Sequence, residues 1–325
     1  MIATTLVVAL ALLLPPLVVA HAQPSGKVYR IGFLGVTRPT PATQHVWDAF
    51  LEGLRDRGYV EGRNLVIERR FSEGREDRYA VFVMELLRDN VDVIVTASTA
   101  AARAGKEATG TVPIVLAGVF EPEKTGLVAS LARPGGNLTG VSNQIGEVQS
   151  KGMQLLKEVL PRITRLAVLW NPDNPGSATA WDEQKQQAKA LGLALISIEI
   201  RTPADVESAL ARLAQERPDA LTPYLVLAPY RGRIIDFALK NRLPTLAWAK
   251  AWVEQGALIS YGPDPVHIYR RTSAYIDRIL RGVKPADLPI EQPTKFEFII
   301  NLRTAKALGL TIPPSVLLRA DQVIE

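Results

Sequence analysis

The residues best suited to ligand chemistry in the first half of the chain are Ser98, Thr99 and Glu121. Ser98-Thr99 follows the apolar run 91–97 and opens a predicted helix over 100–108. Hydroxyls and free backbone N–H groups at a helix start suit a ligand carboxylate, although plain N-capping explains the same residues. Glu121 follows the next predicted strand and could accept an ammonium or a hydroxyl from a ligand, or remain a solvated loop carboxylate.

The second half offers asparagines and aromatic rings at corresponding places. Asn171 and Asn174 follow a predicted strand over 165–170, where they either contact ligand or simply form a turn. Trp170, Tyr230, Trp248 and Tyr261 lie at or just beyond strand ends, and core packing competes with ligand contact for each of them. The full set of candidate ligand-binding residues is Thr37, Ser98, Thr99, Glu121, Asn143, Asn171, Tyr230, Trp248 and Tyr261.

Enzyme chemistry and nucleic-acid binding find little support. The chain has no cysteine and only three histidines, so thiolate chemistry is excluded and a histidine-rich metal site is not expected. It contains no G-x-S-x-G, H-E-x-x-H or P-loop motif. The net charge of +5 comes from basic residues scattered along the chain rather than clustered. We therefore expect no catalytic residues, no cofactor, no metal and no nucleic-acid partner.

Strands and helices alternate through both halves of the chain. Predicted strands cover 29–35, 65–71, 91–97, 113–119, 138–142, 165–170, 194–200, 220–228, 244–248, 257–261 and 296–301. Predicted helices cover 42–57, 77–88, 100–108, 126–132, 149–160, 178–191, 204–215, 231–240, 266–280 and 302–308. The strand over 65–71 alternates in polarity, as an edge strand does. The tail also predicts a last helical turn after Ile312-Pro313-Pro314.

This alternation predicts an α/β fold of two similar lobes. Each lobe is expected to be a parallel sheet flanked by helices, and short hinge crossings are expected to join the lobes. We place the first lobe at 28–143, completed by about 263–285. The second lobe is placed at 144–262 and completed by about 286–325.

The N-terminus predicts export. Residues 1–22 contain a long apolar run followed by Ala20-His21-Ala22, a small-residue cleavage pattern. The run is long enough to span a bilayer, so an uncleaved anchor is the alternative. Pro15-Pro16 and the small-residue exit favour a signal peptide cleaved after Ala22, which leaves a soluble, exported protein.

Several stretches together resemble a known family. They are GYVEGRN at 58–64, GLVASLARPGGNLTG at 126–140, SYG at 260–262, KPADLPIEQP at 284–293 and KFEFIINLRTAKALGLTIP at 295–313, followed by RADQVIE at 319–325. The chain is similar to the substrate-binding proteins of ABC transporters, in the group that includes tryptophan/tyrosine-type binders. It departs from the usual pattern at Glu121-Pro122, where Asp-Pro is common, at Ala257, where a glycine is usual, and at Pro223 within a predicted strand.

The resemblance implies a periplasmic receptor of the type 1 fold. Such a receptor closes on a small solute and delivers it to an ABC permease, and we expect it to be a monomer. The candidate side chains favour an amino acid or a similar small carboxylate, and a sugar remains the alternative. A periplasmic ligand sensor that signals to a membrane receptor is the other functional class left open.

Overall fold

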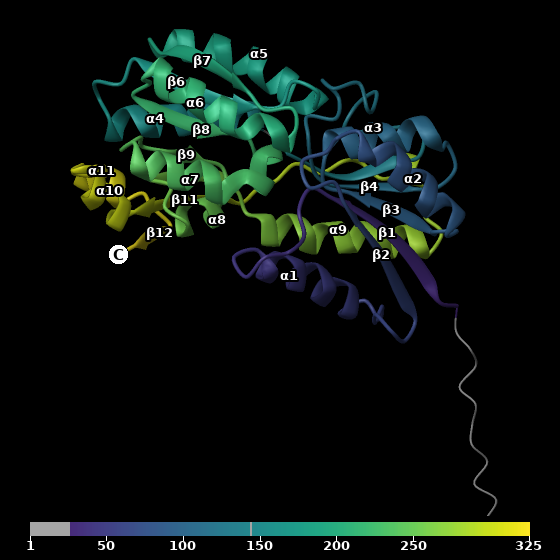
Figure 1. Ribbon diagram of the computed structural model, residues 1–325. Coiled ribbons are helices and arrows are strands. Elements are labelled where there is room, and N and C mark those ends of the chain that lie inside the picture. The colour runs from purple at the N-terminus through teal and green to yellow at the C-terminus, as the bar shows by residue number, and fades with distance from the viewer. Residues whose placement is uncertain (1–26, 144) are drawn as a thin grey trace, which may run out of the picture.

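The computed structural model describes residues 27–143 and 145–325, which form two α/β lobes beside one another (Figure 1). The first lobe is built on a five-stranded parallel sheet in the order β2-β1-β3-β4-β5. Its strands are β1 (Tyr29–Gly35), β2 (Leu65–Phe71), β3 (Val93–Thr96), β4 (Ile114–Phe120) and β5 (Leu138–Asn143). Its helices are α1 (Gln44–Arg55), α2 (Arg78–Arg88), α3 (Thr99–Ala108) and, from much later in the chain, α9 (Pro265–Leu280). The expected signal peptide, residues 1–22, lies outside the described residues.

Helices cover both faces of the first sheet because successive strand side chains point to opposite faces. Phe33 and Val95 pack with residues of α1 and α9 in one buried cluster. Leu34 and Ile94 pack with residues of α2 and α3 in another. The carboxyl ends of these strands are thereby held rigidly at one edge of the lobe, which is where ligands bind to open α/β sheets.

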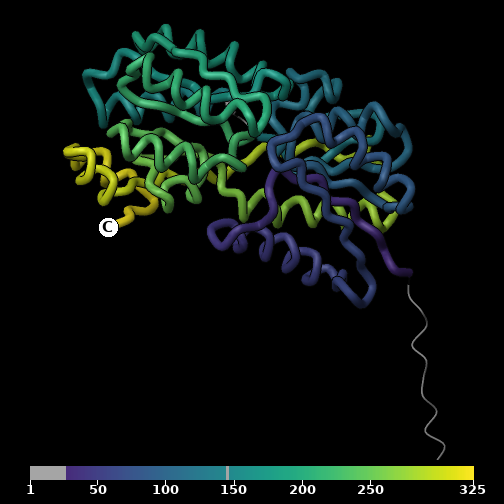
Figure 2. Tube along the Cα trace, viewed as in Figure 1, coloured from purple at the N-terminus to yellow at the C-terminus, as the bar shows by residue number. Residues whose placement is uncertain are grey.

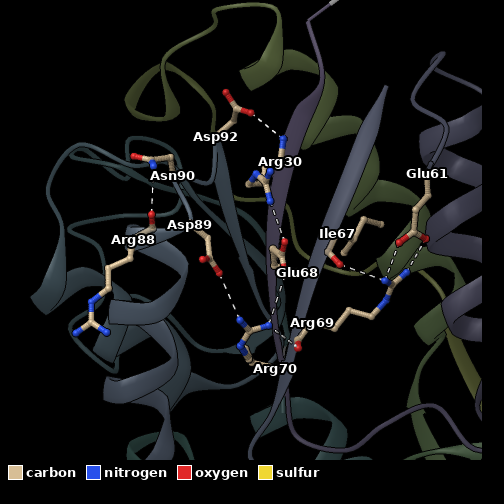
Figure 3. Close-up of polar contacts among 10 residues, drawn as sticks. All are labelled: Arg30, Glu61, Ile67, Glu68, Arg69, Arg70, Arg88, Asp89, Asn90 and Asp92. Carbon is tan, nitrogen blue, oxygen red and sulfur yellow. Dashed lines mark hydrogen bonds and ion pairs between the residues drawn. The ribbon is translucent and has the colours of Figure 1, made fainter. Parts of the chain in front are cut away.

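β2 lies at the edge of the first sheet, as its alternating sequence predicts. Glu68 accepts a hydrogen bond from Arg30 Nη1 at 2.9 Å, and Arg70 pairs with both Glu68 and Asp89 (Figure 3). Arg69 makes a two-pronged ion pair with Glu61 on the neighbouring turn. Ion pairs near the surface contribute about 1 kcal/mol or less each, and charged side chains along an edge strand disfavour its pairing with another chain.

The second lobe has a sheet in two segments, β7-β6-β8 and β12-β11-β10-β9, linked by a bridge between Leu221 and Thr245. Its strands are β6 (Arg165–Trp170), β7 (Ala194–Glu199), β8 (Ala220–Pro223), β9 (Leu246–Ala247), β10 (Ile259–Pro263), β11 (Phe296–Asn301) and β12 (Gln322–Ile324). Its α-helices are α4 (Ile145–Val159), α5 (Pro175–Ala190), α6 (Val206–Glu216), α7 (Arg231–Lys240), α8 (Lys250–Glu254), α10 (Leu302–Leu308) and α11 (Pro314–Leu317). Short 3-10 helices are η1 (Pro203–Asp205), η2 (Leu225–Tyr230) and η3 (Pro285–Asp287).

The chain passes between the lobes at three places (Figure 2). β5 leads into α4, β10 leads back into α9, and the segment between η3 and β11 returns to the second sheet. The first and third passages lie side by side, because Ser142 N–H donates to the Glu291 carbonyl at 2.8 Å. These passages are short, as the sequence predicts.

Three local predictions are wrong. Residues 126–132 form turns rather than a helix: Gly126 has a φ of +72°, and the N–H groups of Leu127 and Val128 both donate to the Pro122 carbonyl. The strand predicted over 220–228 stops at Pro223, and the chain turns into η2. β11 runs antiparallel to β10, so the second sheet is not wholly parallel. In addition, α8 was not predicted.

Within the two described stretches, no helix combines the length and the apolar character needed to cross a membrane.

Candidate functional site

A cavity of about 220 Å³ lies between the lobes, at the carboxyl ends of strands from both sheets. The first lobe contributes Phe33, Gly35, Val36, Thr37, Ala97, Ser98, Thr99, Gly118, Val119, Phe120 and, from α9, Tyr269. The second lobe contributes Gln149, Asn174, Gly176, Ser177, Ala180, Tyr224, Leu225, Val226 and Trp248. A ligand in this cavity would contact both lobes at once.

Two helix starts, one from each lobe, meet at the wall of the cavity. Ser98 is the N-cap of α3, and its side chain makes no capping hydrogen bond, so the first-turn N–H groups keep no partner within the helix. Asn174 is the N-cap of α5, and its Nδ2 donates to Ser98 Oγ at 3.3 Å. A Cβ on Gly176 would lie only 2.5 Å from Thr99 Oγ1, which shows how closely the two helix starts approach. Both helix dipoles therefore direct positive potential at the same volume.

Two polar side chains that line the cavity are buried without hydrogen-bond partners. Gln149 is fully buried, and neither its Nε2 nor its Oε1 makes a hydrogen bond of normal geometry, its polar neighbour being the Tyr224 hydroxyl, which donates to Gln184. Trp248 is 5% exposed, and its indole N–H also has none. Because an unsatisfied buried polar group costs about 1–3 kcal/mol, such groups in a cavity indicate a ligand that satisfies them.

The remaining wall is largely apolar and aromatic. β4 reaches it through an irregularity in its pairing with β5 at Gly118, which has a φ of +75° and is followed by Phe120 at the cavity. Burial raises the pKa of Tyr224, and raises the pKa of Tyr269 to about 12, so both phenols are neutral at neutral pH. None of the described residues around the cavity is an Asp, Glu, Lys or Arg.

Contacts outside the cavity hold the lobes together. Tyr230 of the second lobe donates to the Gly74 carbonyl of the first at 3.4 Å. Lys124 Nζ in the first lobe lies 2.9 Å from Glu183 Oε1 on α5. Together with the contact between Asn174 and Ser98, these bonds define a closed arrangement of the lobes.

Glu76 lies at this junction, behind Asn174. Its Oε1 accepts from Asn174 Nδ2 at 3.2 Å, and its Oε2 has no partner. Burial disfavours the charged carboxylate and raises the pKa of Glu76 from 4.5 to about 7, while the bond from Asn174 partly opposes the shift. Glu76 therefore changes charge near neutral pH in the closed form.

Titration of Glu76 should lower the free energy of unfolding as pH rises. Because the pKa is raised from 4.5 to about 7 in the folded protein, the contribution of Glu76 to stability is complete below pH 4.5 and is lost as pH rises through 7. The full shift would be worth roughly 3 kcal/mol. Because Glu76 keeps some solvent contact, we expect about 1–2 kcal/mol between pH 5 and 8. Urea unfolding of wild type and Glu76→Gln across this range measures the difference.

In that experiment the Glu76→Gln variant should lose the slope, and Glu123→Gln, at an exposed glutamate, should keep it. An equal slope in wild type and Glu76→Gln would contradict the assignment.

The structure brings four of the sequence-predicted candidates to the cavity, namely Thr37, Ser98, Thr99 and Trp248. Asn174, considered with Asn171, also reaches it. Their place at strand carboxyl ends and helix starts explains why the sequence pattern found them.

The other five candidates do not line the cavity. Asn171 forms a turn, accepting from Asp173 N–H and donating to the Arg201 carbonyl. Tyr261 stacks on Phe296, with ring centroids 6.1 Å apart. Tyr230 makes the interlobe hydrogen bond to Gly74 described above. Asn143 is buried where the chain first passes between the lobes. Glu121 lines a separate groove, where its Oε2 lies 3.4 Å from Lys124 Nζ. Trp170 stacks on Trp181, so its role is packing.

Sequence reasoning missed Gln149, Tyr224, Ser177 and the closely approaching Gly176. Gln149 had one detectable signal: it is a polar residue on the otherwise apolar face that carries Val148 and Met153. Tyr224 was hidden because a strand was predicted through Pro223, whereas the turn into η2 is what carries Tyr224, Leu225 and Val226 to the cavity.

The part of the chain that the structure describes contains no group of three or more His, Asp or Glu side chains arranged to hold a metal ion.

Two α/β lobes, three passages and an interlobe cavity define a class, the type 1 periplasmic binding protein fold, which solved structures of similar architecture share. The match to one family is more specific than the fold. This chain belongs to the ABC transporter substrate binding protein family, whose sequence profile matches residues 36–324.

Individual relatives agree with this assignment. The chain is 27% identical over 271 residues to a tyrosine-binding protein of Clostridioides difficile (strain R20291), covering 83% of this chain and 78% of the relative. It is 28% identical to a Streptococcus pneumonia ABC domain solved with L-Trp, with a TM-score of 0.82 over 91% of this chain and 99% of that one. Against a ligand-free, open substrate-binding protein with adhesive properties from Clostridium difficile, identity is 25% and the TM-score 0.62, over 92% and 99% of the two chains. The TM-score is thus higher with the L-Trp complex than with the ligand-free, open structure.

Proposed function

We propose that this protein is the periplasmic solute-binding component of an ABC importer. It closes on a small carboxylate, in the chemical class that includes amino acids, and delivers it to a permease in the inner membrane. The observation that carries this proposal is the interlobe cavity where the starts of α3 and α5 meet over an apolar pocket. Helix starts favour an anion, and the aromatic wall favours an apolar or ring-bearing body.

The relatives support the amino-acid part of the proposal, since one is named for tyrosine and another was solved with L-Trp. We further propose that residues 1–22 are removed on export, and that the protein acts as a monomer without enzymatic activity. We also propose that residues 28–143, completed by about 263–285, form the first lobe and that residues 144–262, completed by about 286–325, form the second. The position of α9 on the first sheet and of β11 and β12 in the second sheet supports this division.

Ligand should shift the lobes toward the closed form. Bonds such as Asn174 to Ser98 exist only when the lobes meet, so a ligand that contacts both lobes binds the closed form preferentially. A thermal-shift screen of amino acids, organic acids and sugars identifies a binder. Small-angle X-ray scattering then measures the radius of gyration with and without it.

We expect a carboxylate to raise the melting temperature and to reduce the radius of gyration. Sugar binding with no carboxylate binding would contradict the proposed ligand class, and an unchanged scattering curve at saturation would contradict closure. A receptor that signals to a membrane sensor is the second candidate. It would show the same closure but no uptake in cells that carry the cognate permease.

A further inference from the structure

The interlobe cavity is polar at one end yet contains no charged side chain among the described residues that line it. The lack of a charged side chain distinguishes two classes of ligand that the proposed function includes together, the α-amino acids and the simple carboxylic acids. An α-amino acid brings a carboxylate and an ammonium, whereas a simple carboxylic acid brings only the anion. We propose that the cavity selects single-ring aromatic monocarboxylates that lack an α-ammonium, such as 3-phenylpropanoate. This inference rests on the proposed function and narrows its ligand class.

The anion has donors within the cavity. The uncapped start of α3 and the hydroxyls of Ser98 and Thr99 line this volume. The start of α5 adds its dipole, although its Ser177 N–H already donates to the Asn174 side chain. Trp248 and Gln149 add an indole N–H and an amide NH₂ that lack partners. The last two are buried beyond nine-tenths, so they provide evidence for a ligand that is independent of the helix starts. A carboxylate oxygen satisfies such donors without any further charge.

The ammonium has no counter-ion there. The carboxylate expected for that role, Glu121, lies in another groove beside Lys124. The other nearby acid, Glu76, does not line the cavity: it lies behind Asn174, whose amide donates to its Oε1, while its Oε2 has no partner. Oxygens such as Gln149 Oε1 can accept a hydrogen bond from an ammonium but cannot neutralise its charge. Burying an ammonium without an opposite charge is costly, so the cavity should disfavour an amino acid relative to its deaminated analogue.

The size of the cavity favours a single ring. An apolar cavity of about 150 Å³ in another protein holds benzene. The volume of about 220 Å³ found here leaves room for one ring and a short carboxylate-bearing chain. Phe33, Phe120 and Tyr269 provide the aromatic wall for such a ring.

The decisive experiment uses a pair of ligands that differ by one group. 3-Phenylpropanoate and L-phenylalanine share the ring, the chain and the carboxylate, and only the second carries an α-ammonium. Titration calorimetry on protein freed of retained ligand should give a Kd at least tenfold lower for 3-phenylpropanoate, which is about 1.4 kcal/mol or more. Neutral 3-phenylpropanamide should bind at least tenfold more weakly than the acid, because the helix starts favour the anion.

One variant tests the missing counter-ion directly. Gln149→Glu places a carboxylate in the cavity and should shift the preference at least tenfold toward L-phenylalanine, whereas Gln215→Glu, on the exposed face of α6, should leave it unchanged. If Gln149→Glu does not fold, the comparison of 3-phenylpropanoate with L-phenylalanine on the wild-type protein still tests the inference. L-phenylalanine binding as tightly as the acid, or L-tryptophan binding without any single-ring acid, overturns this inference and leaves the proposed function intact. Failure of all carboxylates and amino acids to bind overturns both.

Discussion

Gly176→Leu is expected to weaken ligand binding by at least 100-fold, about 2.7 kcal/mol, while leaving each lobe folded. A Cβ at this position would lie 2.5 Å from Thr99 Oγ1 and 3.1 Å from Phe120 Cβ, both in the opposite lobe. A leucine therefore prevents the starts of α3 and α5 from approaching. The lobes can still separate to relieve the clash, so the loss should fall on closure rather than on folding. Titration calorimetry with the best ligand from the screen measures the loss.

Gly232 provides a matched control for this substitution. It is also the second residue of a helix, α7, but a Cβ there would meet open space. Gly232→Leu should bind ligand like wild type, and circular dichroism should show that both variants are folded. Scattering should find Gly176→Leu in the open form even at high ligand concentration. Wild-type affinity in this variant would show that closure does not bring α3 and α5 together.

Ser98→Asp is expected to weaken carboxylate binding strongly while leaving each lobe folded, because the lobes can separate to expose the new carboxylate, which lies near Glu76 in the closed form. Aspartate is as good an N-cap as serine, and its charge also complements the α3 dipole by a few tenths of a kcal/mol to about 1 kcal/mol. The same charge would lie where the ligand carboxylate binds and would occupy the N–H groups that Ser98 leaves uncapped. We expect a loss of affinity of at least 100-fold, about 2.7 kcal/mol, measured by calorimetry.

Thr43→Asp controls for the general effect of an N-cap charge. Thr43 is the N-cap of α1, makes no capping hydrogen bond to that helix, and does not line the cavity. This variant should retain binding, and circular dichroism should show that both variants are folded. If Ser98→Asp still binds the carboxylate ligand, the anion does not lie at the start of α3.

The α/β architecture could be predicted from sequence because its signals are local. Short apolar strands followed by amphipathic helices recur along the chain, and they predict the strand-helix order of both lobes. The predictions were wrong where contacts with other segments of the chain override the local sequence preference. Leu127, Val128 and Leu131 have helical spacing, but the segment forms turns, in which the N–H groups of Leu127 and Val128 donate to the Pro122 carbonyl. The antiparallel direction of β11 depends on the returning passage between the lobes, which has no local signal.

The site could be predicted only in part, for a similar reason. Ser98 and Thr99 were found because a strand end and a helix start mark such residues locally. Tyr261 satisfies the same strand-end rule, yet it stacks on Phe296, which comes from a distant segment. Gln149 and Gly176 reach the cavity only because the two lobes close upon each other. Contacts made between lobes have no periodicity within either one, so sequence reasoning does not find them.

The late position of α9 in the chain has a consequence for biogenesis. α9 covers one face of the first sheet, and its Asp277 accepts a bond from Tyr59, 218 positions earlier. Until α9 leaves the ribosome, Phe50 and Leu54 on α1 lack the α9 residues that pack against them. The first lobe therefore cannot reach its final form before nearly all of the second has been synthesised. Contacts of such long sequence separation also slow folding. A chain that can complete neither lobe until late in its synthesis stays unfolded for longer, which suits the export proposed above.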